Sequence, residues 1–355
     1  MTEKKFHNKV CFVAFLLSLM VVMIHGYNAD MFLELPAREP MEKAVWGLQH
    51  FFAEVIGPVA VPGFFMISSY QFYRSCSFKD IGPKMERRIG TVLLPYIIWN
   101  FFYYLGYAAA GRIPFLAGFS DKTAVELNIL EAADAVLHFT YNPVFWYMYQ
   151  LIFLIALSPV IYLVMKNRYT GLLAVAAELY CIKKQIELPI LNMDALFYYS
   201  AAAYGAFHGR RFFEEEWIEG EDRKKRRSTA LRICFTALGL LLAIIFYQGI
   251  TVRHSVLETV LYRFTLPVTL WLSLSGVRLP DVKEWMKYGF FLYAIHFILA
   301  RGLNKLGAAF LPHTAFSALL LYLLIPIFCV ILAWRLGDFL KSRASLLWQL
   351  ISGGR

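Results

Sequence analysis

Residues Val10 to Asn28 read VCFVAFLLSLMVVMIHGYN. This stretch is apolar for nearly the length of a membrane-spanning helix, which needs about 20 such residues. His25 lies about 15 residues into this run, or roughly 23 Å along a helix that rises 1.5 Å per residue. An ionisable ring at such a depth is costly and therefore informative. The stretch predicts a membrane helix with a candidate functional residue near its far end.

The same apolar character extends over the whole chain of 355 residues, of which 59% are hydrophobic and 17% charged. A soluble domain is about 25% charged. Alternating strand patterns are missing, and helices satisfy their own backbone groups in lipid. We therefore predict an all-α, polytopic integral membrane helical bundle, with a single membrane domain over residues 1–355. About ten transmembrane helices are expected, at residues 10–28, 51–73, 89–110, 144–165, 169–182, 188–209, 229–249, 257–277, 286–308 and 315–338.

The net charge of +10 is distributed as in a membrane protein. If the N-terminus is cytoplasmic, 25 of the 35 lysines and arginines fall in inner segments. This positive-inside bias predicts that both termini are cytoplasmic. It also indicates a multi-pass protein of the cell membrane, as in a bacterial inner or plasma membrane, and argues against a nucleic-acid partner. The inner segment 210–228 combines an acidic and a basic block, and we expect it to be a solvated surface.

Motifs for other chemistries are missing from the sequence. The five cysteines show no CxxC spacing, which argues against a zinc site or a disulfide framework. The chain contains no GxxxxGK[ST], HExxH or GxSxG sequence. We therefore expect no metal, and the informative residues are the polar ones inside the predicted spans.

Two histidines lie deep in different spans. His25 is either an interfacial ring near the outer headgroups or a neutral general base that faces the bundle interior. His296, near the middle of the ninth span, is either a packing residue or part of the same polar site. Tyr293 lies three residues earlier, on the same helical face. Histidine is suited to general base catalysis because its unperturbed pKa lies near neutrality.

Basic residues precede the third predicted span. Arg87 and Arg88, with Lys84 before them, are either topology anchors or a clamp for phosphate oxygens, which guanidinium groups bind in bidentate fashion. We place the arginines at the start of a helix, where free N–H groups favour anions.

Three further residues stand out inside or beside the spans. Tyr70 belongs to a polar group at the inner end of the second span, where packing is the simpler explanation. Trp146 opens the fourth span and fits either an interfacial aromatic belt or a site. Arg263, in the eighth span, either snorkels outwards or pairs with Glu258.

Six segments together resemble one family, the polytopic membrane acyltransferases known as acyltransferase family 3. They occur in the family's order, from the first span to the ninth. The matching segments are VVMIH (21–25), FFMISSY (64–70), RRIGTVLLPYIIW (87–99), FWYMYQL (145–151), YYSAAAYGAFHGRR (198–211) and YAIH (293–296). Two positions depart from the pattern: Ser69 stands for a usual glycine, and Ala14 stands where many members carry an arginine.

The resemblance implies an enzyme that transfers an acyl group, usually acetyl from acetyl-CoA, to a hydroxyl or amine. The acceptor would be a cell-envelope sugar or polysaccharide, a cell-wall component or a lipid-linked glycan, with membrane lipid around the chain. We expect His25, His296 and Tyr293 at the catalytic centre. We expect Arg87, Arg88 and Lys84 to bind the CoA phosphates. Tyr70, Trp146 and Arg263 are the candidate substrate-binding residues.

Two other functions are compatible with these residues. A proton-coupled transporter or exporter of a small solute or glycan also uses intramembrane histidines and proline-broken helices. A non-catalytic membrane scaffold would explain the missing arginine at position 14. Turnover of the thioester separates the enzyme from both.

Overall fold

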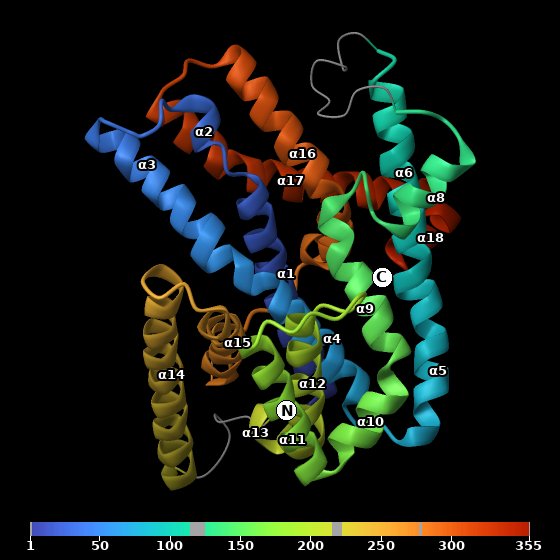
Figure 1. The fold of residues 1–355 in the computed structure, drawn as a ribbon, viewed down its shortest axis with the longest axis vertical. Coiled ribbons are helices and arrows are strands. Elements are labelled where there is room, and N and C mark those ends of the chain that lie inside the picture. The colour runs from blue at the N-terminus through green and yellow to red at the C-terminus, as the bar shows by residue number, and fades with distance from the viewer. Residues whose placement is uncertain (1, 114–124, 215–221, 277–278, 355) are drawn as a thin grey trace. The chain divides into compact units, whose positions relative to one another are not determined.

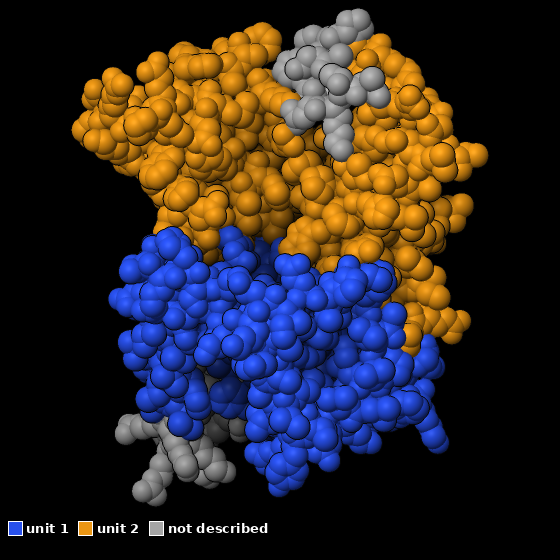
Figure 2. Space-filling model, viewed as in Figure 1, with its two compact units in different colours: residues 1–17, 58–84, 153–283 blue, residues 18–57, 85–152, 284–355 orange. Residues whose placement is uncertain are grey.

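A computed structural model of the chain describes residues 2–113, 125–214, 222–276 and 279–354 (Figure 1). All regular elements in these ranges are helices, which confirms the all-α prediction. The chain divides into two compact units, and each is described separately (Figure 2). Unit 1 comprises residues 1–17, 58–84 and 153–283, and unit 2 comprises residues 18–57, 85–152 and 284–355.

Several helices are long and apolar enough to cross a membrane. Among the described residues there are five, or six if the pair Pro143–Ala156 and Ser158–Lys166, bent by 64°, forms one span. Each of the ten predicted spans overlaps a helix in the described part of the chain, and residue 277, where the eighth span was predicted to end, lies outside it. The count of ten and the orientation of the termini remain predictions. The five are Glu3–Phe32, Pro40–Tyr73, Phe78–Ala110, Ile233–Thr251 and Ala315–Arg343.

Two helices begin well before the predicted spans. The helix of the second predicted span starts at Pro40, where a capping box with Glu42 satisfies the first backbone groups. The helix of the third predicted span starts at Phe78, and its first part is polar and amphipathic, so a search for apolar runs does not detect it. Each is interrupted by a wide π-turn, and the second of these turns ends at Leu93, two residues before Pro95. Proline lacks the N–H that would continue the ladder, and a π-turn absorbs the resulting bend.

Unit 1 is a bundle in which α4 packs along α12, and α14 along α15. Side-chain caps start its helices: Asn167 caps α11, Asn192 caps α12 and Ser255 caps α15. Helix α1 (Glu3–His25) begins in this unit. The other helices are α4 (Ala60–Tyr73), the first part of α5 (Phe78–Arg88), α10 (Ser158–Lys166), α11 (Arg168–Lys183), α12 (Met193–His208), α13 (Arg210–Glu214), α14 (Asp222–Thr251) and α15 (Val256–Ser273), with the short turns η2 (Gly57–Val59) and η5 (Leu274–Gly276).

Unit 2 packs α16 against α17, and α18 against α6. It contains the end of α1 and the start of α9 (Trp146–Ala156). The other elements are α2 (Ala29–Phe32), α3 (Pro40–Phe51), η1 (Phe52–Ile56), η3 (Ile89–Leu93), α6 (Leu94–Ala110), α8 (Ile129–Leu137), η4 (Pro143–Phe145), η6 (Glu284–Tyr288), α16 (Gly289–Phe310), α17 (Ala315–Arg343) and α18 (Ser345–Ser352).

Gly337 is required where α17 meets two buried rings. A Cβ atom there would lie 2.7 Å from Cε1 of Tyr288 and 3.2 Å from Cζ3 of Trp348. We expect Gly337→Ala to destabilise the fold by about 1–3 kcal/mol, because overpacking displaces neighbours. Gly302→Ala is the matched control, since nothing lies within 4 Å of a Cβ there. It should raise stability by about 0.5–1 kcal/mol. Thermal unfolding in detergent measures both, and equal shifts would contradict this packing argument.

Candidate active site

The structure brings the two deep histidines together within unit 2. His25 is the last residue of α1, and His296 lies in the first half of α16. Their ring centroids are 5.2 Å apart with the planes inclined by 47°. The edge of Phe297 also packs on His25, with ring centroids 5.2 Å apart. Two residues that are distant in sequence therefore form one contact, which we call the histidine pair.

The hydrogen bonds of His296 define its tautomer. Nδ1 lies 2.6 Å from the carbonyl oxygen of Tyr293, which can only accept a hydrogen bond. Nδ1 must therefore carry a proton and donate it. Nε2 then has a free lone pair in the neutral ring, and it is buried without a hydrogen-bond partner among the described residues. One nitrogen of the histidine pair is thus available as a hydrogen-bond acceptor or a base.

Tyr293 connects α16 to the turn that leads into α9. Its hydroxyl donates to the carbonyl of Val144 at 2.5 Å, and its ring stacks on Phe145. Its ring centroid is 5.9 Å from that of His296. The hydroxyl proton of Tyr293 is thus used in a hydrogen bond that links α16 to η4. Trp146 follows this turn at the start of α9 and is 38% exposed.

A group of buried amides surrounds the end of α1, and the sequence analysis missed it. Asn28, Gln49 and Asn304 are each at most 3% exposed and bond to one another. We call these three residues the amide cluster. A signal was present in the sequence, because Asn304 lies eight residues after His296 and thus on the same face of its helix.

The basic residues of the third span differ from the prediction in one respect. Arg87 and Arg88 lie in the last turn of α5, and the helical backbone continues from Phe78 to Ala110. Free N–H groups therefore do not occur there, and the proposed helix-start contribution to anion binding is wrong. Arg87 is exposed and Arg88 half-buried. The amine of Lys84 donates to the carbonyl of Phe72 at 2.5 Å.

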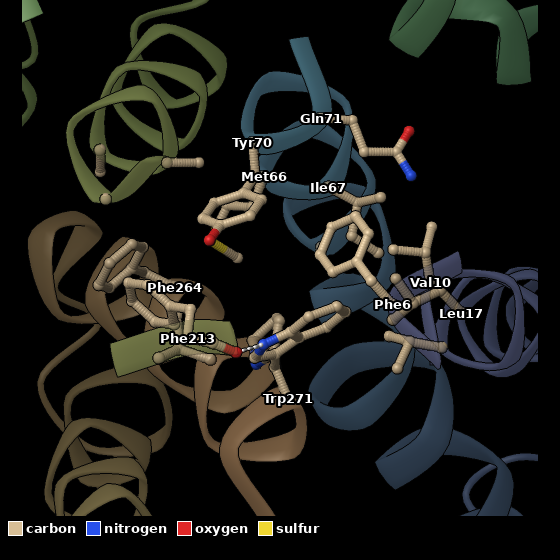
Figure 3. A pocket seen from close by; sticks show the side chains of 17 residues that line it. Phe6, Val10, Leu17, Met66, Ile67, Tyr70, Gln71, Phe213, Phe264 and Trp271 are labelled. Atoms are coloured by element: carbon tan, nitrogen blue, oxygen red, sulfur yellow. Dashed lines mark hydrogen bonds between the residues drawn. The ribbon is translucent and has the colours of Figure 1, made fainter. Parts of the chain in front are cut away.

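Tyr70 lies on the wall of a pocket within unit 1. The pocket, drawn in Figure 3, is formed by α1, α4, α12, α13 and α15 and holds about 690 Å³ of empty space, open solvent at its mouth included. Its wall is almost entirely apolar, with the rings of Phe6, Phe213 and Trp271 among it. The hydroxyl of Tyr70 donates to Glu214 at 3.0 Å.

Glu214 belongs to a charged network and not to a solvated surface. It was expected to be exposed, but it is 8% exposed because Arg74 binds both of its oxygens, at 2.6 and 2.9 Å. Arg74 also binds both oxygens of Glu3, at 2.7 and 2.8 Å. Burial by itself would raise the pKa of Glu214, but the hydrogen bonds from Arg74 and Tyr70 lower it below its usual value. The following stretch, 215–221, lies outside the described residues.

Arg263 does not pair with Glu258, as one interpretation of the sequence had suggested. Glu258 is bound by Arg253, whose Nη2 lies 2.5 Å from Oε2. Arg263 is half-buried on α15 and interacts electrostatically with Asp194 of α12. It therefore faces an acidic partner within the helical bundle of unit 1.

Comparison with known proteins identifies the family. Residues 15–336 match the family described as acyltransferase domain. A relative is the succinoglycan biosynthesis protein ExoH of Rhizobium meliloti (strain 1021), 28% identical over 165 residues, which are 46% of this chain and 44% of that protein. The aligned part is thus less than half of that relative. No solved structure matches the chain. Since the family match spans most of the chain and contains both histidines, the chain belongs to the acyltransferase domain family.

Proposed function

We propose that the chain is a multi-pass membrane acyltransferase that moves an acyl group, in the first place acetyl, from acyl-CoA to a sugar hydroxyl of a cell-envelope polysaccharide. The observation that carries this proposal is the contact between His25, at the end of α1, and His296, in the first half of α16. The family supports acyl transfer. The relative's role in succinoglycan biosynthesis supports a glycan as the acceptor.

The proposed reaction begins with His25 as a general base. It takes the proton of the acceptor hydroxyl while the oxygen attacks the carbonyl carbon of the thioester. The C–O bond forms, the C–S bond breaks, and the thiolate of CoA takes the proton back from His25. His296 packs against this ring, and the lone pair of its Nε2 has no hydrogen-bond partner among the described residues. General base assistance of this kind contributes about 10²–10⁴-fold to the rate.

Arg87, which is exposed, and Arg88, which is half-buried, are the proposed contacts for the phosphates of the donor. We expect the double variant Arg87→Gln, Arg88→Gln to raise the KM for acetyl-CoA at least ~10-fold, because each hydrogen bond to a charged group contributes about 1.5–3 kcal/mol. kcat should change by less than ~2-fold, because binding is lost equally in the ground and transition states. Arg343→Gln, an exposed arginine in the last turn of α17, is the control. An unchanged KM would remove these arginines from the donor site.

The proposed function is tested with purified protein in lipid nanodiscs. Radiolabelled acetyl-CoA and an envelope glycan fraction are added, and label is counted in the glycan and CoA release is followed in parallel. We expect both, in equal amounts. Glycan or solute flux across proteoliposomes without any thioester turnover would favour a transporter and overturn the proposal.

A further inference from the structure

We infer that the amide cluster of Asn28, Gln49 and Asn304 positions His25 against His296. The meaning of this for catalysis rests on the proposed function, but the structural part does not. The cluster lies at the point where α1 ends, directly after His25. None of the three side chains belongs to the histidine pair, so they act through the backbone that carries it.

Asn304 binds the chain just beyond His25. Its Nδ2 donates to the carbonyls of Gly26 and Tyr27, at 3.2 Å in each case. Its Oδ1 accepts from Nδ2 of Asn28 at 3.1 Å. Because Asn304 and His296 are on the same helix, these bonds tie the backbone after one histidine to the helix that carries the other. Helix α16 thus holds His296 and, through Asn304, the backbone next to His25, and so sets the distance between the two rings.

Gln49 closes the network from α3. Its Oε1 accepts from the backbone N–H groups of Asn28 and Ala29, at 2.9 and 3.0 Å. Its Nε2 donates to Oδ1 of Asn28 at 3.0 Å and to the carbonyl of Ala318 at 3.4 Å. The turn after His25 is therefore bound to α3, α16 and α17 at once.

Moving any part of the amide cluster is costly, because the side-chain amide of each of its three residues is hydrogen-bonded. A buried amide without partners costs about 1–3 kcal/mol, so a displacement of the turn would leave several such groups unpaired at once. A helix end without these bonds would fray, because its last carbonyls have no partners within the helix. Misplacing a reacting group by about 1 Å can cost about 100-fold in rate, so holding this helix end has a direct effect on His25.

The kinetic test uses Asn304→Leu, which keeps the branching and the number of heavy atoms of the side chain and removes all three hydrogen bonds. We expect kcat for acetyl transfer to fall about 10–100-fold, with the KM for acetyl-CoA within ~2-fold of the original. The control is Asn100→Leu on α6. Asn100 is also buried, but in the described part of the chain its amide donates to the carbonyl of Tyr96 on its own helix and to no other element.

A double-mutant cycle separates positioning from a general structural role. If Asn304 acts through His25, Asn304→Leu should cause no further loss of rate in a His25→Gln background. The same fold-loss in both backgrounds would show that Asn304 acts elsewhere, and would overturn the inference.

A second measurement does not depend on activity. Solid-state NMR of protein with ¹³C,¹⁵N-labelled histidine should show a cross-peak between the rings of His25 and His296, assigned with single His→Gln variants. We expect this cross-peak in the parent protein and in Asn100→Leu, and its loss in Asn304→Leu. Its persistence with unchanged shifts in Asn304→Leu would refute the positioning role. If the parent protein transfers no acetyl group but the cross-peak behaves as described, the positioning role stands and the proposed function fails.

Discussion

His25→Gln should lower the rate of acetyl transfer by about 10²–10⁴-fold, the amount that a general base contributes. Glutamine keeps the approximate size and polarity of the side chain but cannot take up a proton at neutral pH. The amide cluster binds only backbone atoms next to His25 and the variant leaves those atoms in place. The KM for acetyl-CoA and the unfolding temperature should therefore change little. Initial rates with radiolabelled acetyl-CoA and thermal unfolding in detergent measure the two effects.

The control for this variant is His254→Asn. His254 is exposed and precedes α15 in unit 1, at a backbone φ of 48° that asparagine tolerates well. It should transfer acetyl at the parental rate. Parental activity of His25→Gln, with His254→Asn equally active, would exclude His25 as the base.

The second large effect is expected for stability and concerns Arg74. Arg74→Met should destabilise unit 1 by about 3 kcal/mol, because it removes the arginine that binds both oxygens of the buried Glu214 carboxylate and leaves that carboxylate with Tyr70 and with Arg210, which is 42% exposed and 3.2 Å away. The side chains of Arg74 and Glu214 are only 11% and 10% exposed. The fall in unfolding temperature measures this loss. Tyr70, on the wall of the pocket, also bonds to Glu214, so we expect the variant to disturb this pocket wall as well.

Arg253→Met is the control for Arg74, because its pair with Glu258 is more exposed, at 48% and 25%. Its loss should lower the unfolding temperature much less than the loss of Arg74 does, because solvent screens an exposed ion pair. The effect of Arg74 also depends on pH. The pKa of Glu214 is lowered below 4.5, so the stabilisation by its ionised form is fully present above that pH and is lost as the pH falls through the lowered pKa. Equal destabilisation by both variants at pH 7 would contradict the buried network.

The length of apolar runs was sufficient to predict where the helices lie but not where they begin. Residues 51–73 and 89–110 are helical as expected. Their helices start earlier, at Pro40 and Phe78, because capping and amphipathic packing extend a helix beyond its apolar part. The fourth predicted span is bent by 64° at Leu157. At this point α10 starts with a proline in its first turn. Such a proline is typical of a new helix start, but a hydropathy profile does not detect it.

The candidate site was partly predictable for a similar reason. A histidine in an apolar helix is costly anywhere, so His25 and His296 could be recognised one at a time. Their contact depends on how α1 and α16 pack, which sequence spacing does not specify. The burial of Glu214 was missed because it depends on Arg74, which is distant in sequence. The amide cluster was missed because neutral amides give a weak signal until their partners are known.

We propose that this chain acylates an envelope glycan with His25 as the base. Mass spectrometry of the envelope polysaccharide tests it most directly, in cells that lack the gene and carry either the parental sequence or the His25→Gln variant at equal membrane abundance. The polysaccharide should lose the mass of one acyl group per modified sugar in the deletion strain, regain it with the parental sequence, and fail to regain it with His25→Gln. An identical acylation pattern in all three strains would contradict the account.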